Sequence, residues 1–382
     1  MTPFHRSINF SMRKKLLLIS MILLGTALLS ACTGGARSTS WPGLAANGDV
    51  AYLTDGTLVY AVNLKDGREL WQYSDKNDSK AQFYSIPAIT SDGLVIVGSA
   101  GGTYTLYSLD PNDIVTDDKG VNKPNPRWTF NGAKGPWEAS PLIIGDLLFA
   151  PNSDGNLYVL NLKDGQSAKS AVKTIKLTGR LWSTPVTDGK RVFVTSLDNS
   201  VFGIDLETYE YWHQDLAGAI PGSPVIGSDG MLYVGSLASQ LEKFDPATGT
   251  HQPVLTLDAK KLIWSTPVSD GDALYFADLD GNFYSFNTAT GTLNWDPIQP
   301  DGPITATPLV LGNNILLGTE SGSIFEVDKA GHSKLWSQPG GNIYTNLVST
   351  GDLVIVAPLS ADNYLYAFDM DGHQAWAFTP GK

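Results

Sequence analysis

The sequence predicts an all-β fold, an eight-bladed β-propeller in which each blade is a four-stranded antiparallel sheet. One pattern recurs eight times from Ser40 onward, at the spacing of a repeat protein. The segments between its turns are short, aromatic and rich in β-branched residues. Both faces of these segments are apolar, as a sheet packed between two neighbouring blades requires. The alternative is two β-sandwich domains, which the spacing disfavours because nothing divides the chain into halves.

Residues 1–31 are predicted to be an export signal. Arg13, Lys14 and Lys15 precede an uncharged apolar run over 16–29, and Leu29-Ser30-Ala31-Cys32 follows at once. This arrangement resembles bacterial lipoprotein signals, which implies cleavage before Cys32 and lipidation of that cysteine. A transmembrane anchor is the alternative, but the run is shorter than the roughly 20 apolar residues that a bilayer requires. Translation starting at Met12 would leave residues 1–11 out of the protein.

A lipid on Cys32 would place the protein outside the cytoplasm, on the outer membrane facing the periplasm or on the outer face of the cytoplasmic membrane. Residues 32–39 are small and polar and are interpreted as a lipidated tether, with the propeller over 40–382. Cys32 is the only cysteine, so that no disulfide forms within the chain and a large core is expected.

The predicted mature chain is acidic. Residues 1–31 contain four of the 26 Lys and Arg residues and none of the 38 Asp and Glu residues, so that 22 basic and 38 acidic residues remain, a formal charge of −16. Nucleic acid and anionic lipid surfaces are recognised by clustered Lys and Arg. We therefore expect no nucleic-acid partner, and contact with the membrane only through the lipid.

The clearest copy of the blade pattern spans residues 264–295. Asp270-Gly271 and Asp280-Gly281 are hairpin turns, and Pro267 is acceptable at the start of an innermost edge strand. The opening prolines are Pro42, Pro87, Pro141, Pro185, Pro224, Pro267 and Pro308, with Asn346 in the eighth copy. The third strands are expected over 58–63, 106–110, 157–161, 201–205, 241–245, 283–287, 324–328 and 365–369. A closing tryptophan follows in six copies, at Trp71, Trp128, Trp212, Trp295, Trp336 and Trp376, and is missing from blades three and five.

Together, the Ser-Thr-Pro, Asp-Gly, Leu-Tyr-x-Phe-Asn, Thr-Gly and Trp elements resemble the pyrroloquinoline-quinone (PQQ) type of propeller repeat. The quinoprotein alcohol dehydrogenases that share this repeat imply an adjacent cysteine pair over the cofactor, which a chain with only Cys32 lacks. A haem-binding Cys-x-x-Cys-His motif is missing as well. We therefore expect no cofactor, and a PQQ-dependent periplasmic oxidoreductase or another ligand-binding protein is the alternative function.

In overall plan, the chain resembles the propeller lipoproteins of the bacterial outer-membrane β-barrel assembly machinery. The lipoprotein signal, short tether, eight blades and length carry this resemblance. It implies a non-catalytic, lipid-anchored scaffold that binds other envelope proteins through a propeller face, in outer-membrane protein assembly.

No catalytic or metal site is expected. His213, His251, His332 and His373 are too far apart around the ring to share a metal. Asp278-Leu279-Asp280-Gly281-Asn282 has the look of a calcium loop, but similar Asp- and Asn-rich turns stand at the same place in other blades, so that turn chemistry explains it.

Six aromatic residues near the start of innermost strands form the predicted interaction surface. By repeat position they should circle one mouth of the central channel, where rings with a polar handle suit recognition. They are Phe83, Tyr84, Trp137, Trp182, Trp264 and Tyr344. The alternative is that each ring packs against a neighbouring blade. A second candidate is the long third turn of blade two, over Pro111–Arg127, which is either an interaction loop or disordered.

Overall fold

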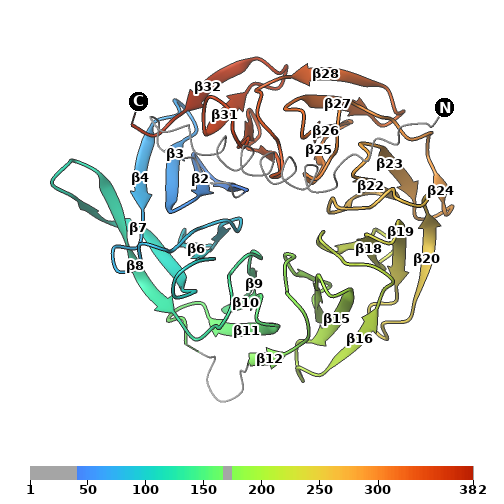
Figure 1. The fold of residues 1–382 in the computed structure, drawn as a ribbon, viewed down its shortest axis with the longest axis horizontal. Coiled ribbons are helices and arrows are strands. Elements are labelled where there is room, and N and C mark those ends of the chain that lie inside the picture. The colour runs from blue at the N-terminus through green and yellow to red at the C-terminus, as the bar shows by residue number, and fades with distance from the viewer. Residues whose placement is uncertain (1–40, 167–173, 382) are drawn as a thin grey trace, which may run out of the picture. The chain divides into compact units, whose positions relative to one another are not determined.

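The computed structural model describes residues 41–166 and 174–381 and confirms the predicted architecture. Thirty-two strands form eight four-stranded antiparallel sheets, arranged as blades around a central channel (Figure 1). Each blade consists of four strands consecutive in the sequence. Within the described residues, no helix is long and apolar enough to span a membrane. The predicted export signal and tether, Cys32 included, lie outside the described residues.

The blades follow one another in chain order. Blade 1 consists of β1 Gly43–Asn47, β2 Val50–Asp55, β3 Leu58–Asn63 and β4 Glu69–Tyr73, and blade 2 of β5 Ala88–Ile89, β6 Val95–Gly98, β7 Leu106–Thr116 and β8 Asn122–Phe130. Blade 3 consists of β9 Leu142–Ile144, β10 Leu147–Pro151, β11 Asn156–Asn161 and β12 Thr174–Lys176, and blade 4 of β13 Val186–Thr187, β14 Arg191–Thr195, β15 Ser200–Asp205 and β16 Tyr211–Asp215. Blade 5 consists of β17 Val225–Ile226, β18 Leu232–Ser236, β19 Gln240–Phe244 and β20 His251–Thr256, and blade 6 of β21 Val268–Asp270, β22 Ala273–Ala277, β23 Phe283–Asn287 and β24 Thr292–Leu293. Blade 7 consists of β25 Leu309–Leu311, β26 Asn314–Gly318, β27 Ile324–Asp328 and β28 Ser333–Ser337, and blade 8 of β29 Val348–Ser349, β30 Val354–Val356, β31 Leu365–Phe368 and β32 Gln374–Phe378. The eight strands expected from the sequence are the third strands of these blades.

The core of the protein lies between neighbouring blades. In blade 6, Leu274 and Phe276 of β22 pack toward blade 5, whereas Tyr275 and Ala277 pack toward blade 7. Successive side chains of a strand point to opposite faces, so that both faces of a middle strand are buried. A fully buried Leu or Phe contributes roughly 1.5–3 kcal/mol to folding. The ring therefore derives its stability from blade-to-blade contacts.

Five of the six closing tryptophans contact the third turn of the following blade. Trp128 donates a hydrogen bond from Nε1 to the carbonyl of Leu162 at 2.9 Å, and a Cβ added to Gly165 would lie 2.4 Å from the same indole. This glycine also has a φ of +65°, which only glycine adopts at little cost. The same pairing of indole and glycine recurs at Trp212 with Gly249, Trp295 with Gly331, Trp336 with Gly372 and Trp376 with Gly67.

The ring closes without strand exchange between the ends of the chain. Blade 1 holds β1–β4 and blade 8 holds β29–β32, so that each is complete. A shared core cluster joins Leu44 and Leu53 of blade 1 to Ile355 and Phe378 of blade 8. Trp376 Nε1 donates to the carbonyl of Leu64 at 2.7 Å across the same junction. Side-chain packing thus holds the first blade to the last.

The long turn of blade 2 is an ordered hairpin. Strands β7 and β8 continue their pairing through Ile114–Pro124 and Thr116–Asn122, and the hairpin projects past the edge of the ring (Figure 1). It also contacts blade 1, where Asn122 Nδ2 donates to the carbonyl of Leu70 at 3.1 Å. The alternative that this segment is disordered is therefore wrong.

Candidate functional site

The candidate site is the mouth of the central channel, formed by the extended segments that lead into the innermost strands. Burial alternates along the segment of blade 4: Leu181, Ser183 and Pro185 are buried, whereas Trp182 and Thr184 are partly exposed. The same alternation runs over 343–347 and 263–267. In an extended chain, one set of alternate side chains enters the core between blades and the other faces the channel.

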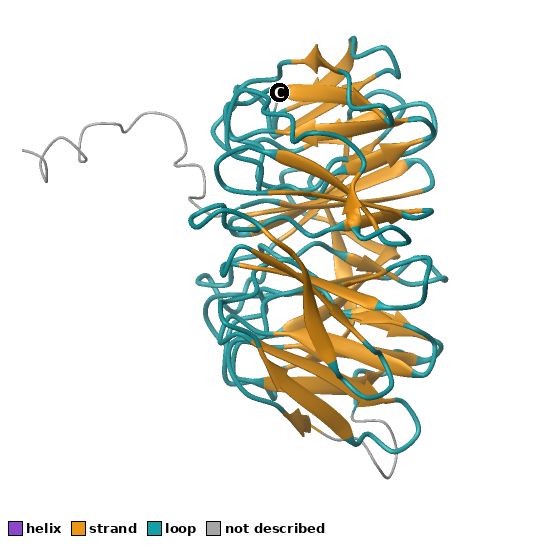
Figure 2. Ribbon diagram, turned by 90° about the vertical axis from the view of Figure 1, so that its right-hand side faces the viewer, coloured by secondary structure: helices purple, strands orange, loops and turns teal. Residues whose placement is uncertain are grey.

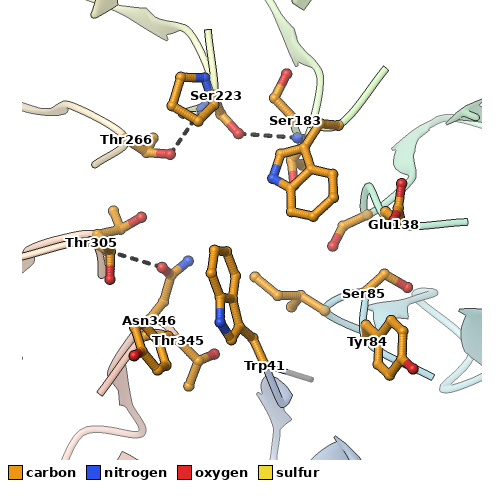
Figure 3. Close-up of a pocket in the computed structure, with 18 of the residues that line it drawn as sticks. Trp41, Tyr84, Ser85, Glu138, Ser183, Ser223, Thr266, Thr305, Thr345 and Asn346 are labelled. Carbon is orange, nitrogen blue, oxygen red and sulfur yellow. Dashed lines mark hydrogen bonds between the residues drawn. The ribbon is translucent and has the colours of Figure 1, made fainter. Parts of the chain in front are cut away.

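Eight residues, one from each blade, form a ring at this mouth, here called the entry ring. Each stands three positions before the place of the strand-opening proline, which Leu347 holds in blade 8, so that the expectation of Asn346 at this place is wrong by one position. They are Trp41, Tyr84, Glu138, Trp182, Pro221, Trp264, Thr305 and Tyr344, and all eight line one cavity of about 380 Å³. Figure 3 shows this cavity from inside the ring. Four of the six aromatic residues expected at the mouth are therefore there.

Phe83 and Trp137 do not line the mouth, and their predicted placement is wrong. Their side chains are 0% and 1% exposed, within the clusters between blades 1 and 2 and between blades 2 and 3. Trp137 Nε1 donates to the carbonyl of Tyr104 at 2.7 Å. Each residue stands one position before its blade's entry-ring residue, and a shift of one residue along an extended chain reverses the side to which a side chain points.

Trp41 is the entry-ring residue that the sequence prediction missed. The prediction placed Pro42 in register with the strand-opening prolines of the other blades. Counted back from the Asn47-Gly48 turn, however, Leu44 occupies the proline position and Trp41 corresponds to Trp182. The turn, whose geometry fixes the register of a hairpin, was the signal that could have identified it.

Aromatic contacts join Trp41 to rings from three other blades. Its ring stacks on Tyr344 with centroids 5.3 Å apart and planes inclined by 18°. It meets Trp264 edge to face at 5.8 Å and 71°, and Trp182 at 6.2 Å and 88°. These are the stacked and edge-to-face geometries that aromatic pairs prefer.

A ring of polar groups lies below the aromatic residues. The backbone N–H of Thr184 donates to Ser223 Oγ at 3.0 Å, and that of Ser223 donates to Thr266 Oγ1 at 2.9 Å (Figure 3). The N–H of Thr307 donates to Asn346 Oδ1 at 3.1 Å. These bonds join successive blades around the channel. A second cavity of about 620 Å³, walled by opening prolines such as Pro87 and Pro267, shares these polar residues with the first.

Two charged groups at the mouth, Arg180 and Glu138, form an ion pair. Arg180 Nη2 donates to both carboxylate oxygens of Glu138 at 2.7 Å, and its guanidinium lies 5.4 Å from the centroid of the Trp182 ring. Burial raises the pKa of Glu320 above its ordinary 4.5. Burial and the neighbouring Glu320 carboxylate raise the pKa of Tyr344. The Glu138 charge is thus neutralised by Arg180, whereas Glu320 adds a carboxylate beside Tyr344.

The Asp278 turn has the hydrogen bonds expected of a structural turn. The buried Asp278 carboxylate accepts from the backbone N–H of Asp280 at 3.0 Å, from that of Asn282 at 2.9 Å, and from the Tyr284 hydroxyl at 2.7 Å. These donors come from the turn itself and from the strand that follows, so that turn chemistry accounts for the motif.

Within the described residues, one group of three possible metal ligands stands close together. Oxygen or nitrogen atoms of Asp369, Asp371 and His373 lie within 4.8 Å of one another. Asp369 already accepts from the backbone N–H groups of Asp371 and His373, at 3.0 and 2.9 Å. This cluster is a largely exposed turn, and the expectation of no metal site stays a prediction.

Fold and site together define a closed eight-bladed propeller with PQQ-like repeats and an aromatic channel mouth. A family model described as outer membrane protein assembly factor BamB matches residues 27–252, 204–339 and 265–378. The chain belongs to this family, as the resemblance found in the sequence implied.

Individual relatives agree with this assignment. The outer membrane protein assembly factor BamB of Legionella pneumophila is 24% identical over 369 residues, covering 86% of this chain and 80% of its own. That of Burkholderia pseudomallei is 24% identical over 271 residues, covering 67% and 69%. The crystal structure of BamB from Moraxella catarrhalis superposes with a TM-score of 0.63 at 21% identity, covering 89% of this chain and 94% of that one. The computationally designed Ika8 protein reaches a TM-score of 0.67 at 14% identity, covering 87% and 98%, which shows that likeness at this level reports the fold alone.

Proposed function

We propose that this protein is a non-catalytic scaffold in the assembly of outer-membrane proteins and binds other envelope proteins through its channel mouth. The observation that carries the proposal is membership of the BamB family over most of the propeller. The relatives named above are assembly factors of the outer membrane, and this function is transferred to the chain on that basis. The alternative of a PQQ-dependent oxidoreductase lacks the adjacent cysteine pair, since Cys32 is the only cysteine.

The chemistry of the mouth supports a binding role. Partly exposed Trp and Tyr side chains are enriched among the residues that contribute most to protein interfaces, because they bury a large area with few rotatable bonds. Trp182 and Trp264 are fixed by a rigid backbone: their neighbours Leu181 and Ile263 pair with Ser196 and Asp278 of the same blades. A preorganised aromatic surface loses little entropy on binding.

The proposed location is the periplasmic side of the outer membrane, with the lipid on Cys32 as the anchor. The lipoprotein-like signal and the name of the relatives, outer membrane protein assembly factors, support this proposal. A Cys32→Ser variant should move from the membrane fraction to the soluble periplasmic fraction. Retention of this variant in the membrane after a high-salt wash would contradict lipid anchoring. The acidic chain supports the further proposal that nucleic acid is not a partner.

Gene deletion tests the proposed function. Loss of the protein should lower the amount of folded barrel proteins in the outer membrane, measured by heat-modifiable mobility on gels. The native gene should restore that amount, and a Trp182→Ala plus Trp264→Ala variant should restore it only in part. Tyr211→Ala is the matched control, because Tyr211 is an aromatic residue 45% exposed on an outer strand, β16. Unchanged barrel-protein levels in the deletion strain would refute the proposal.

A further inference from the structure

Trp41 holds a position at the mouth that no other entry-ring residue holds. Its indole extends into the middle of the channel mouth (Figure 3) and contacts rings from blades 4, 6 and 8. Among the described residues, it is the aromatic partner that Trp182, Trp264 and Tyr344 share. These three rings form a cage, here called the aromatic cage, that holds one face of an indole by stacking and its edges by perpendicular contacts.

The backbone beside each ring of the cage is held by a β-bridge. Asn342, two residues before Tyr344, pairs with Leu359, and the residues next to Trp182 and Trp264 form bridges of the same kind. Trp41 precedes the first residue of β1, and the next residue is Pro42, which has no N–H to donate to a sheet. The cage is therefore fixed, and three ring contacts hold the indole of Trp41 within it.

The cavity beside the indole offers hydrogen-bond donors. Ser223 and Thr266 accept bonds from backbone N–H groups through their hydroxyl oxygens, and Asn346 accepts one through Oδ1. Over residues 41–166 and 174–381, the structure gives no acceptor for the hydroxyl hydrogens of Ser223 and Thr266 or for the amide hydrogens of Asn346. Donors in this position match the backbone carbonyls of an extended peptide, whose N–H and C=O groups have no internal partners.

The charges at the mouth favour an uncharged segment. Arg180 and Glu138 neutralise each other at 2.7 Å, so that neither sign of charge predominates beside Trp182. Among the described residues that line the cavity, Glu138 is the charged one and is already paired, so that a segment rich in Lys or in Asp would lose hydration on entering without gaining an unpaired partner charge from the lining.

We propose that the aromatic cage binds the side chain of a tryptophan carried by an uncharged, extended segment of a partner protein, and that Trp41 occupies this place in the unliganded propeller. The inference rests on the proposed function, according to which an envelope protein supplies the segment. It goes further by naming the chemical character of that segment. Trp41 is then a competing occupant that the partner displaces.

Peptide binding to the purified propeller tests the proposal. The probe is Thr-Ser-Trp-Pro-Gly, the sequence of residues 39–43, blocked at both ends and carrying 5-fluorotryptophan, with binding followed by fluorine NMR up to millimolar peptide. The Trp41→Ala propeller should bind the probe at least tenfold more tightly than the native protein. Adding Trp264→Ala should weaken that binding at least tenfold, whereas adding Tyr211→Ala should leave it unchanged.

Three results would overturn the proposal: equal affinity of the native and Trp41→Ala proteins, equal affinity with and without Trp264, or displacement of the probe by a peptide with Ala in place of Trp. Thermal unfolding establishes that each variant is folded. If Trp41→Ala does not fold, the resonance of 5-fluorotryptophan at position 41 of the otherwise native protein is the readout. Unlabelled Thr-Ser-Trp-Pro-Gly should shift that resonance toward its position in unfolded protein, and no shift refutes displacement. The experiment uses purified protein, so that its failure is distinct from unchanged barrel-protein levels in the deletion strain.

Discussion

The contact between a closing tryptophan and a glycine of the next blade predicts a difference between two substitutions that look alike in the sequence. Gly67 and Gly291 stand at the same third turn, in blades 1 and 6, with φ of +71° and +74°. Gly67 faces Trp376 of the preceding blade, and an added Cβ would lie 2.7 Å from that indole. Gly291 follows blade 5, which has no closing tryptophan, and an added Cβ would meet nothing within 4 Å.

The expected magnitudes follow from these surroundings. An L-residue in the left-handed region costs about 1–2 kcal/mol of folding free energy, and this cost is common to Gly67→Ala and Gly291→Ala. Overpacking costs typically about 1–3 kcal/mol. A shift of the indole also weakens the 2.7 Å hydrogen bond from Trp376 to the carbonyl of Leu64, a bond worth about 0.5–1.5 kcal/mol. Since the last two effects overlap, Gly67→Ala should be destabilised by about 2 kcal/mol more than Gly291→Ala.

Thermal and urea unfolding of the two variants measure this difference, with near-ultraviolet circular dichroism reporting on the environment of the indoles. Gly67→Ala should unfold at the lower temperature and should alter the tryptophan signal, whereas Gly291→Ala should retain the native spectrum. Equal destabilisation of the two variants would refute the conclusion that the glycine is needed to accommodate the indole.

Three further predictions concern single residues. Phe83→Ala should cost about 3–5 kcal/mol of stability because Phe83 is fully buried, whereas Tyr84→Ala should cost under about 1 kcal/mol. Urea unfolding measures both costs, and similar values would contradict the alternation of buried and channel-facing side chains at the mouth. Burial raises the pKa of Glu320, so that the stability of the folded protein falls as pH rises through this raised value. Glu320→Gln should therefore raise the melting temperature at pH 7 and change it little below pH 4. A lower melting temperature of this variant at pH 7 would be contrary evidence. The hydrogen bond from Lys123, at 2.7 Å, lowers the pKa of Asp117 from 3.8 to about 2. The stabilisation that the Asp117 carboxylate gives the hairpin tip is therefore complete above pH 3.8 and is lost as pH falls through 2. Hydrogen exchange at the tip should accelerate in that window in the native protein and not in Asp117→Asn.

The fold could be predicted from the sequence because its determinants are local and repeated. Each Asp-Gly or Thr-Gly pair sets a turn by its own backbone requirements, as in blade 6, where Gly271, Gly281 and Gly291 all have positive φ. The apolar character of both strand faces then leaves packing between blades as the arrangement that buries them. Eight repetitions of these signals specify a ring even where one copy departs from the pattern.

The site could be predicted only in part because its placement depends on single-residue register. Aromatic content alone does not distinguish Tyr84 from Phe83, although one lines the channel and the other fills the core. Trp41 was missed because Pro42 lies two positions from the register that the turn sets. The course of the long hairpin of blade 2 across blade 1 depends on contacts between distant residues, such as Asn122 with Leu70, and no local pattern encodes them.

The two alternating positions at the mouth vary very differently within this one chain. The position that enters the core is apolar in blades 2 to 8, where it is held by Phe83, Trp137, Leu181, Ile220, Ile263, Ile304 and Ile343, all at 0% or 1% exposure. The entry ring, by contrast, includes Trp, Tyr, Glu, Pro and Thr. A core position is restricted by packing on all sides, whereas a position facing the channel is restricted only by what the channel binds. Substitutions in the entry ring can therefore change what binds while the blade contacts that stabilise the fold stay intact. For this reason, Trp264→Ala added to the Trp41→Ala propeller should weaken peptide binding at least tenfold in a protein that still melts near the temperature of Trp41→Ala alone.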